Sequence, residues 1–373
     1  RSSRTTSNDG LSLTTAGSIK GASGILVEGV RRYVKNDGQI DKSDIRYYQD
    51  EADIFMKSEL YVGDDKTSSA DYMKRLLLLN GLILEDSSEE VLQVVPGIEV
   101  SSPGDLTLSA DWDLTHQRYE VGAGVLILRA PGDLTLDRSL VDHPTPLKQL
   151  NDALMSEPNT WQLNLVSGAD RDSADIMATK LGVGDFTIAD GQIAYTENAS
   201  IQFASGKDTN IGSPPADNST HRYMVNYKMA YSLGTYSGDI DGNIGGNLTI
   251  VENGAIQSAT GNIRIATGGD LHIEIDKYSG SAIRTTGTAP PNMQFGGLDW
   301  LYLETHDGGN INLGIGGDVW VDQIAFFDSQ NVSTPHLLYW DNMYPLSQSS
   351  QDLQWAADYG TFFAQKTTPT AGV

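Results

Sequence analysis

The chain of 373 residues contains no cysteine, and this absence excludes several classes of protein. Disulfide scaffolds, thiolate metal centres and cysteine nucleophiles all require that residue. No apolar run approaches the roughly 20 residues of a membrane span, and the longest, LLLLNGLIL, is interrupted by Asn80 and Gly81. No signal peptide is evident, and the first residue is Arg1, so we expect a processed or excised segment.

Basic residues are also scarce, because 25 Lys and Arg stand against 49 Asp and Glu for a net charge of −24. This balance argues against nucleic acid, whose phosphates need clustered cations, and against an anionic membrane surface. The six histidines show no metal-ligand spacing, so zinc is disfavoured. We predict no cofactor. Calcium is the alternative metal, since acidic glycine-rich turns offer oxygen ligands, but Asp239 to Asn247 is only a faint echo of a calcium-binding repeat.

Glycine, by contrast, is abundant and periodic. The phrase Gly-[Asp/Asn]-apolar-x-apolar occurs eight times, and its copies begin at Gly104, Gly132, Gly184, Gly246, Gly261, Gly269, Gly309 and Gly317. The alternation turns both apolar side chains of each phrase to one face of a short strand. The leading glycine accepts positive φ, and the following Asp or Asn bonds its own backbone in turns.

The repetition predicts stacked units, because a strand of about four residues with one apolar face is not stable alone. Two architectures compete: a parallel β-helix and an antiparallel sandwich built from hairpins. The phrases spaced by eight residues fit two strands of one rung joined by a corner. The step from Gly246 to Gly269 is near one full turn of such a coil. We therefore predict an all-β parallel β-helix (β-solenoid) with inserted flanking helices.

Composition divides the chain into four parts. We predict first β-helix rungs in residues 1–30, a helical insertion packed on the solenoid in 31–95, the main β-helix in 96–325, and an aromatic and helical segment in 326–373. One helix is expected to place Ile45, Tyr48, Ala52, Phe55 and Met56 on one apolar face, followed by Leu60, with Ser43 as its N-cap. A second is expected near SSADYMKRLLLL and a third from about residue 349 to 363. A polar, proline-containing stretch interrupts the strands near residues 205–226.

Three stretches carry a family resemblance. VVPGIEVSSPGDLTLSADWDL, RYEVGAGVLILRAPGDLTLDRSLVD and WQLNLVSGAD, within residues 94–170, resemble the internal region of filamentous-haemagglutinin-like large secreted bacterial exoproteins. The resemblance implies a right-handed parallel β-helix. It also implies two-partner secretion through an outer-membrane transporter and display on, or release from, the cell surface. The secretion module of that family and any attachment motif are not found in the sequence, so this chain resembles an internal piece.

Candidate site residues are few. Most aspartates follow glycine at strand starts, where corner capping explains them. Asp111 and Asp113 flank Trp112 and should face away from the indole if the stretch is extended. The tryptophans are expected mainly to cap core ends or pin helices. In DWLYLETH, Trp300 and Tyr302 share the face opposite Leu301 and Leu303, so we predict them as an exposed contact surface.

These observations favour a structural or interaction protein over an enzyme: a surface-exposed or secreted β-solenoid segment in adhesion or an extracellular filament. Expected partners are neighbouring segments or copies of the same exoprotein, including end-to-end self-association, and the outer-membrane transporter during export. A β-helix enzyme acting on acidic polysaccharide is a rival, although the net charge of −24 repels such substrates. A phage or appendage fibre segment is the other rival.

Overall fold

A computed structural model describes residues 18–20, 25–55, 83–85, 92–118, 123–142, 160–214, 231–274, 281–285, 308–321 and 361–362. Within these ranges the chain is almost entirely strand and turn, with α1 (Lys42–Phe55) as the one helix. A short parallel pair, β1 (Ser18–Lys20) and β4 (Ile83–Glu85), lies apart from three larger sheets. No helix in the described part of the chain is long and apolar enough to cross a membrane.

The three larger sheets are named here I, II and III. Sheet I contains β2 (Ile25–Val34), β5 (Leu92–Ser101), β8 (Val125–Arg129), β11 (Gln162–Val166), β14 (Ile201–Ser205), β17 (Ile240–Ile244), β20 (Ile263–Thr267) and β23 (Ile311–Ile315). Sheet II contains β3 (Gln39–Ile40), β6 (Leu106–Leu108), β9 (Leu134–Leu136), β12 (Phe186–Ile188), β15 (Thr209–Ile211), β18 (Leu248–Ile250), β21 (Leu271–Ile273) and β24 (Val319–Val321). Sheet III contains β7 (Trp112–Asp113), β10 (Leu140–Asp142), β13 (Ala194–Thr196), β16 (Leu233–Thr235), β19 (Ala255–Ser258), β22 (Ala282–Thr285) and β25 (Thr361–Phe362).

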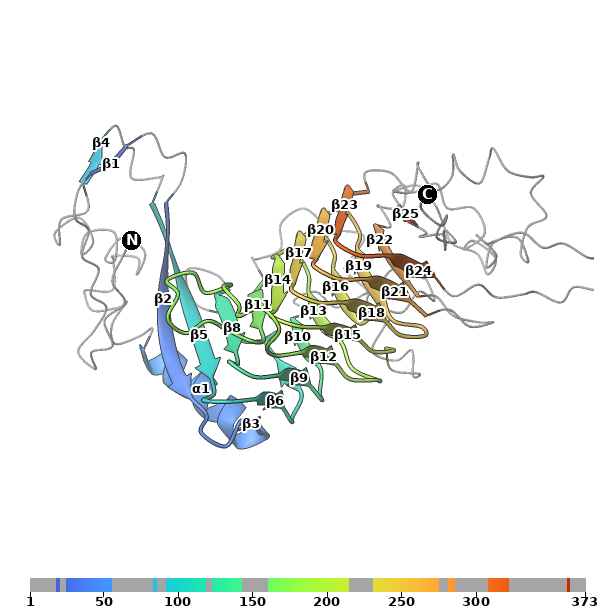
Figure 1. The fold of residues 1–373 in the computed structure, drawn as a ribbon. Coiled ribbons are helices and arrows are strands. Elements are labelled where there is room, and N and C mark those ends of the chain that lie inside the picture. The colour runs from blue at the N-terminus through green and yellow to red at the C-terminus, as the bar shows by residue number, and fades with distance from the viewer. Residues whose placement is uncertain are drawn as a thin grey trace, which may run out of the picture.

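From β5 to β24 the chain visits sheets I, II and III in turn, so each sheet takes every third strand (Figure 1). All neighbours within the sheets pair in parallel except β25, which pairs antiparallel with β22. Parallel pairing rules out the hairpin-built sandwich, since hairpins join antiparallel strands. The three parallel sheets are consistent with the predicted parallel β-helix. We call one passage through the sheets a rung.

The spacing of the glycine phrases is confirmed as the spacing of the rungs. The two phrases eight residues apart form β20 in sheet I and β21 in sheet II, which are consecutive strands of one rung. Leu248 of β18 pairs with Leu271 of β21, and the ladder contact between these strands spans 23 residues. One phrase therefore lies directly over its copy in the next rung.

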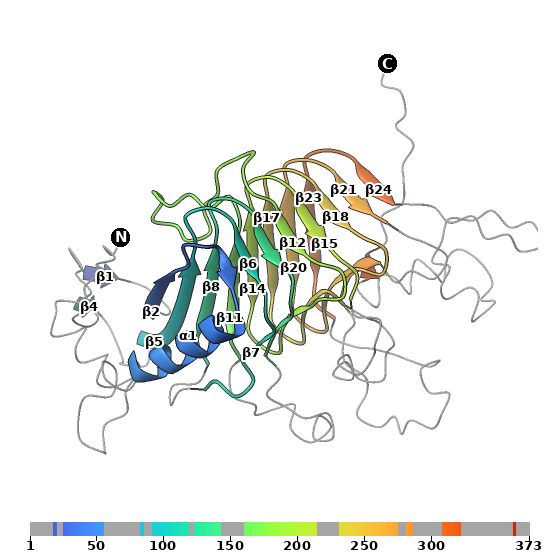
Figure 2. The ribbon, with the colours of Figure 1, turned by 90° about the horizontal axis from the view of Figure 1, so that it is seen from below.

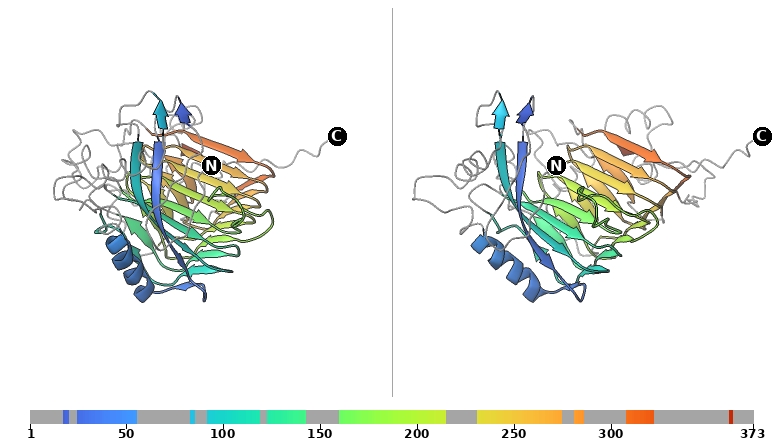
Figure 3. Two further views of the ribbon diagram at one scale, coloured as in Figure 1. Left: turned by 90° about the vertical axis from the view of Figure 1, so that its left-hand side faces the viewer. Right: turned by 60° about the vertical axis from the view of Figure 1, so that its left-hand side comes forward.

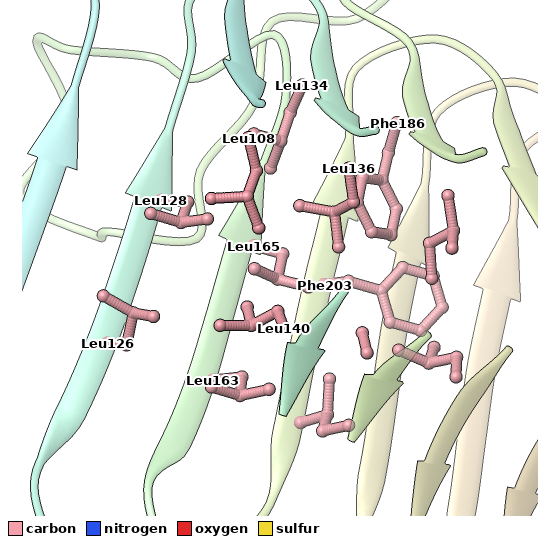
Figure 4. Close-up of a cluster of buried hydrophobic side chains, with 14 of the residues drawn as sticks. Leu108, Leu126, Leu128, Leu134, Leu136, Leu140, Leu163, Leu165, Phe186 and Phe203 are labelled. Carbon is pink, nitrogen blue, oxygen red and sulfur yellow. The ribbon is translucent and has the colours of Figure 1, made fainter. Parts of the chain in front are cut away.

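A single apolar core runs between the sheets. Six of the eight strands of sheet II show the pattern buried, partly exposed, buried, because their first and third residues point inward. Figure 4 shows leucines of sheet I pointing toward apolar side chains of the other two sheets. The sheet I residues are Leu126, Leu128, Leu163 and Leu165, and they face Leu134, Leu136 and Phe186 of sheet II and Leu140 of sheet III. Each buried aliphatic side chain contributes about 1.5–3 kcal/mol, so every rung stabilises its neighbours through stacked side chains.

Three residues of the predicted face of α1, Ile45, Tyr48 and Ala52, are buried as expected, and the rest of that face lies outside the residues whose side chains the structure describes. Its N-cap, however, is Asp41 and not Ser43. Asp41 Oδ1 accepts hydrogen bonds from the backbone N–H groups of Ser43 (2.7 Å) and Asp44 (3.0 Å), and the Asp41 N–H donates to Asp44 Oδ2 (2.9 Å). The Ser43 hydroxyl also donates to Asp41 Oδ1, and these donors lower the pKa of Asp41 to about 2.

Several other predicted elements differ from the structure or lie outside its described part. Strand β15 falls in the stretch predicted to interrupt the strands at residues 205–226, and Thr361–Phe362 forms a strand where a helix was predicted. Strands β2, β3 and β5 place rung strands on both sides of α1, inside the range 31–95. The second predicted helix lies outside the described residues, as does most of the third.

Candidate interaction surfaces

The aspartates of the glycine phrases form a continuous ladder along the outer edge of sheet II. At each step the side-chain Oδ1 accepts a hydrogen bond from the backbone N–H of the equivalent residue one rung further on. The six steps join Asp105 to Asp133 (2.9 Å), Asp133 to Asp185 (2.8 Å), Asp185 to Asp208 (3.1 Å), Asp208 to Asn247 (2.8 Å), Asn247 to Asp270 (2.7 Å) and Asp270 to Asp318 (2.7 Å).

This ladder corrects the expected role of both phrase residues. The side chain of the Asp or Asn accepts a hydrogen bond from the backbone of the next rung and not from its own turn. It therefore links one rung to the next. The glycine is needed chiefly for space: a Cβ on Gly132 would collide with Asp105 Oδ1, and one on Gly269 would collide with Asn247 Oδ1. Of the eight phrase glycines, only Gly184 has a positive φ, at 78°.

Beside the ladder, the middle residues of the sheet II strands form an outward-facing polar row. In register these are Gln39, Thr107, Thr135, Thr187, Asn210, Thr249, His272 and Trp320. They are partly exposed from Thr107 to Trp320. The outward residues of the other sheets vary along the stack: Ile127, Asn164 and Gln257 are at most 1% exposed, whereas Asn243, Arg264 and Ala266 of β17 and β20 are exposed. Sheet II is the wall whose outward row is partly exposed at every step from Thr107 to Trp320.

Two basic residues bind carboxylates of the preceding rung. Arg264 donates to both Asp241 oxygens (2.6 and 3.0 Å) and to Asp239 (2.8 Å), while Lys207 contacts Asp185 (3.1 Å). Burial opposes ionisation of Asp239, but the Asn262 N–H and the Arg264 guanidinium outweigh it and lower its pKa. A carboxylate held ionised in this way is unsuited to general-acid work, so the cluster acts as a clamp between rungs.

The structure describes some of the predicted site residues and not others. Trp300 and Tyr302 lie outside the described residues, so the structure does not place them. Asp111 and Asp113 are exposed while Trp112 is buried, as expected. Their oxygens accept the backbone N–H groups of Ser139 (3.1 Å) and Thr115 (2.8 Å), which is turn and rung capping. No three acidic or histidine side chains in the described ranges could together hold a metal ion.

Two tryptophans are buried in the core, and of these Trp112 packs beside a helix as predicted. Trp112 is fully buried, with its ring 6.3 Å from that of Tyr48 on α1. Trp161 is also fully buried, and its indole N–H donates to the Gln117 carbonyl (2.7 Å). Its backbone N–H donates to the buried Asp142 carboxylate (2.7 Å), which Arg118 also binds (2.6 Å). Burial is the largest influence on Asp142 and raises its pKa despite these donors.

The two ends of the stack differ. At the first end α1 packs against the β2 and β5 side of the core (Figure 2). Tyr48 lies 4.5 Å from Tyr33 between ring centres, and Ile40 is fully buried. At the far end the inward residues of β23 and β24 are only partly buried, although their partners one rung back are at most 5% exposed. The last described rung therefore leaves apolar side chains accessible.

No family model, curated protein or solved structure matches the chain. The resemblance to filamentous-haemagglutinin-like exoproteins thus rests on the sequence motifs within residues 94–170.

Proposed function

We propose that the chain is a structural and interaction segment of a filamentous-haemagglutinin-like exoprotein, displayed on or released from a bacterial cell surface. In this proposal the rungs close into a right-handed parallel β-helix that serves adhesion or an extracellular filament. Export through an outer-membrane transporter belongs to the same proposal, because the family motifs imply it.

One observation carries the proposal: three parallel sheets, up to eight strands long, share one core and repeat in register. Such a stack holds its outer walls at fixed spacing, about 4.8 Å per rung. Repeat proteins of this kind commonly work as extended surfaces, since each unit contacts only its neighbours and the stack can be long. A rod suits contact with partners better than it suits enclosure of a small substrate.

The charges support a non-enzymatic role. Arg264 is engaged by two carboxylates of the adjoining rung, and the phrase aspartates are engaged by backbone N–H groups. The Oδ1 atoms of the phrase aspartates from Asp105 to Asp270 are thus engaged in holding rungs together. The net charge of −24 favours solubility outside the cell and disfavours anionic polysaccharide as a substrate.

Surface location tests the proposal. Antibodies raised against the purified chain are applied to intact producing cells, to permeabilised cells and to the culture medium. We expect labelling of intact cells or recovery from the medium, with no further gain on permeabilisation. Antigen found only after permeabilisation would remove the surface role. The enzymatic rival is tested by incubating the protein with acidic polysaccharides and measuring the length of the polysaccharide afterwards. A shortened polysaccharide would support the enzyme and contradict the proposal.

A further inference from the structure

We infer that copies of this chain stack head to tail, with the last rung of one copy (β23 and β24) accepting the first rung of the next (β2 and β3). This inference rests on the proposed filament function and names its contact. The occupant of the open end is thus a second copy of the same chain.

The topology makes the two ends complementary. Sheet I begins with β2 and ends with β23, and sheet II begins with β3 and ends with β24, and no described strand pairs with these outer edges. Within each of these sheets all strands run in one direction (Figure 3). A translation along the stack would therefore bring β23 of one copy beside β2 of the next, and β24 beside β3, in parallel. Strand edges that have no partner strand among the described residues are templates for strand addition.

Sheet III behaves differently and limits the contact to two walls. Its far end is closed by β25, which pairs antiparallel with β22. At its near end α1 packs on Trp112, and Gln49 of α1 donates to the Asp113 carbonyl (3.4 Å). The chain itself adds an extra strand to the end of one sheet, which shows that the end of the stack accepts edge pairing.

Apolar side chains are accessible at both ends. Ile311, Leu313, Ile315, Val319 and Val321 are partly buried against the core at the far end. At the near end Val34 and Tyr47 are 56% and 54% exposed, two of the four exposed large hydrophobic side chains in the described residues. Stacking would remove both sets from water, and buried apolar area is the main driving force of association.

The hydrogen-bond ladder also continues across the contact. Asp318 is the last described step, and its backbone N–H already donates to Asp270 Oδ1. Because Thr107 pairs with Gln39, the position level with Asp105 at the near end is Asp37. In the stacked pair the Asp37 N–H of the next copy would reach Asp318 Oδ1, as at each earlier step. A contact between two different ends does not close on itself and so produces a filament.

Two variants block the two ends separately. Leu313→Lys places a charge on the accepting edge. Val34→Pro removes a donor from the opposite edge: the Lys35 N–H bonds to Ser101 of β5 (2.7 Å), so the alternating Val34 N–H points away from β5. Circular dichroism and thermal melting first confirm that each variant keeps its fold. Sedimentation velocity over a concentration series then measures association of the wild type, each variant and their mixture.

We expect the wild type to grow with concentration, more so at high salt because the net charge repels copies. Each variant alone should associate at least about tenfold more weakly. Their equimolar mixture should form a one-to-one complex that grows no further, since one intact contact remains. A wild type that stays monomeric throughout, or Val34→Pro protein that associates like the wild type, would overturn the inference. A monomer that is elongated in solution scattering would leave the proposed rod function standing, whereas a compact one would remove both.

Discussion

The two ends of the stack start from the same rung pattern and finish differently. At the first end α1 lies against the core, so Tyr33 and Ile40 are buried although they belong to the outermost strands. At the far end the last described rung repeats the phrases with Ile311, Leu313 and Val319, yet these side chains remain partly exposed. The difference teaches that a repeated rung buries its core only when something covers it, because each unit has one apolar face to satisfy.

The largest predicted loss of stability comes from disrupting the contact between α1 and the core at the covered end. Tyr48→Ala removes a buried ring that packs on Tyr33 and Trp112, and should cost about 4 kcal/mol of the free energy of unfolding. Tyr47→Ala, on the exposed face of the same helix, is the matched control and should cost less than about 1 kcal/mol. Chemical denaturation measures both. Equal losses would show that α1 does not cover the core.

A second comparison sets the last described rung against the rung directly before it. Ile263 and Ile311 are register partners in β20 and β23, but Ile263 is fully buried and Ile311 is partly exposed. Ile263→Ala should cost about 3 kcal/mol, and Ile311→Ala about 1 kcal/mol, because little cavity forms at an open site. The denaturant midpoints of the two variants show which substitution destabilises the fold more. A larger loss at Ile311 than at Ile263 would contradict the open end.

The glycines sharpen the same contrast. Gly269→Ala would force a Cβ against the Asn247 side chain and the Gly246 backbone, and should cost about 2 kcal/mol. Gly314, in the last rung, has no heavy atom within 4 Å of an added Cβ, so Gly314→Ala should change the free energy of unfolding by less than about 0.5 kcal/mol. Thermal melting of both variants is sufficient. Similar melting temperatures would remove the steric explanation of the glycine phrase.

The smallest predicted effect concerns the ladder. Asp208→Ala leaves the Asn247 N–H without its acceptor and should lower the free energy of unfolding by about 1 kcal/mol. The ion pair of Asp208 with Lys207 adds little to this loss, because it is exposed. Asp318→Ala, at the last described step, should be nearly neutral. Hydrogen exchange at the Asn247 amide provides a local readout and should accelerate only in the first variant. Unchanged exchange there would argue against the inter-rung bond.

Much of the parallel arrangement could be predicted from the glycine phrases, because their spacing is the spacing of the rungs. Six of the eight phrases form sheet II and two form sheet I. Sheet III carries none of them. Its strands, such as Ala194–Thr196 and Leu233–Thr235, are short and rich in small residues, so their alternation is too weak to identify from sequence. Strand β15 was missed because Lys207 occupies the glycine position of its phrase.

The contacts of the polar residues were harder to predict. The phrase aspartates could be assigned to corners, but their partners are 23 to 52 residues away, and local turn chemistry gives no hint of them. Asp41 and Ser43 both satisfy the pattern of an N-cap, and only the backbone geometry distinguishes them. The clamp at Arg264 has no local signature either, because its two carboxylates belong to the preceding rung.

The central claim is that successive phrases are stacked in parallel at a constant rise, and the absence of cysteine allows a direct measurement. Spin labels on Thr107→Cys, combined in turn with Thr187→Cys, Thr249→Cys and His272→Cys, lie two, four and five steps apart along sheet II. At about 4.8 Å per step, pulsed electron paramagnetic resonance should give separations between the two labels of about 10, 19 and 24 Å. Separations that do not increase with the number of rungs would contradict the stack.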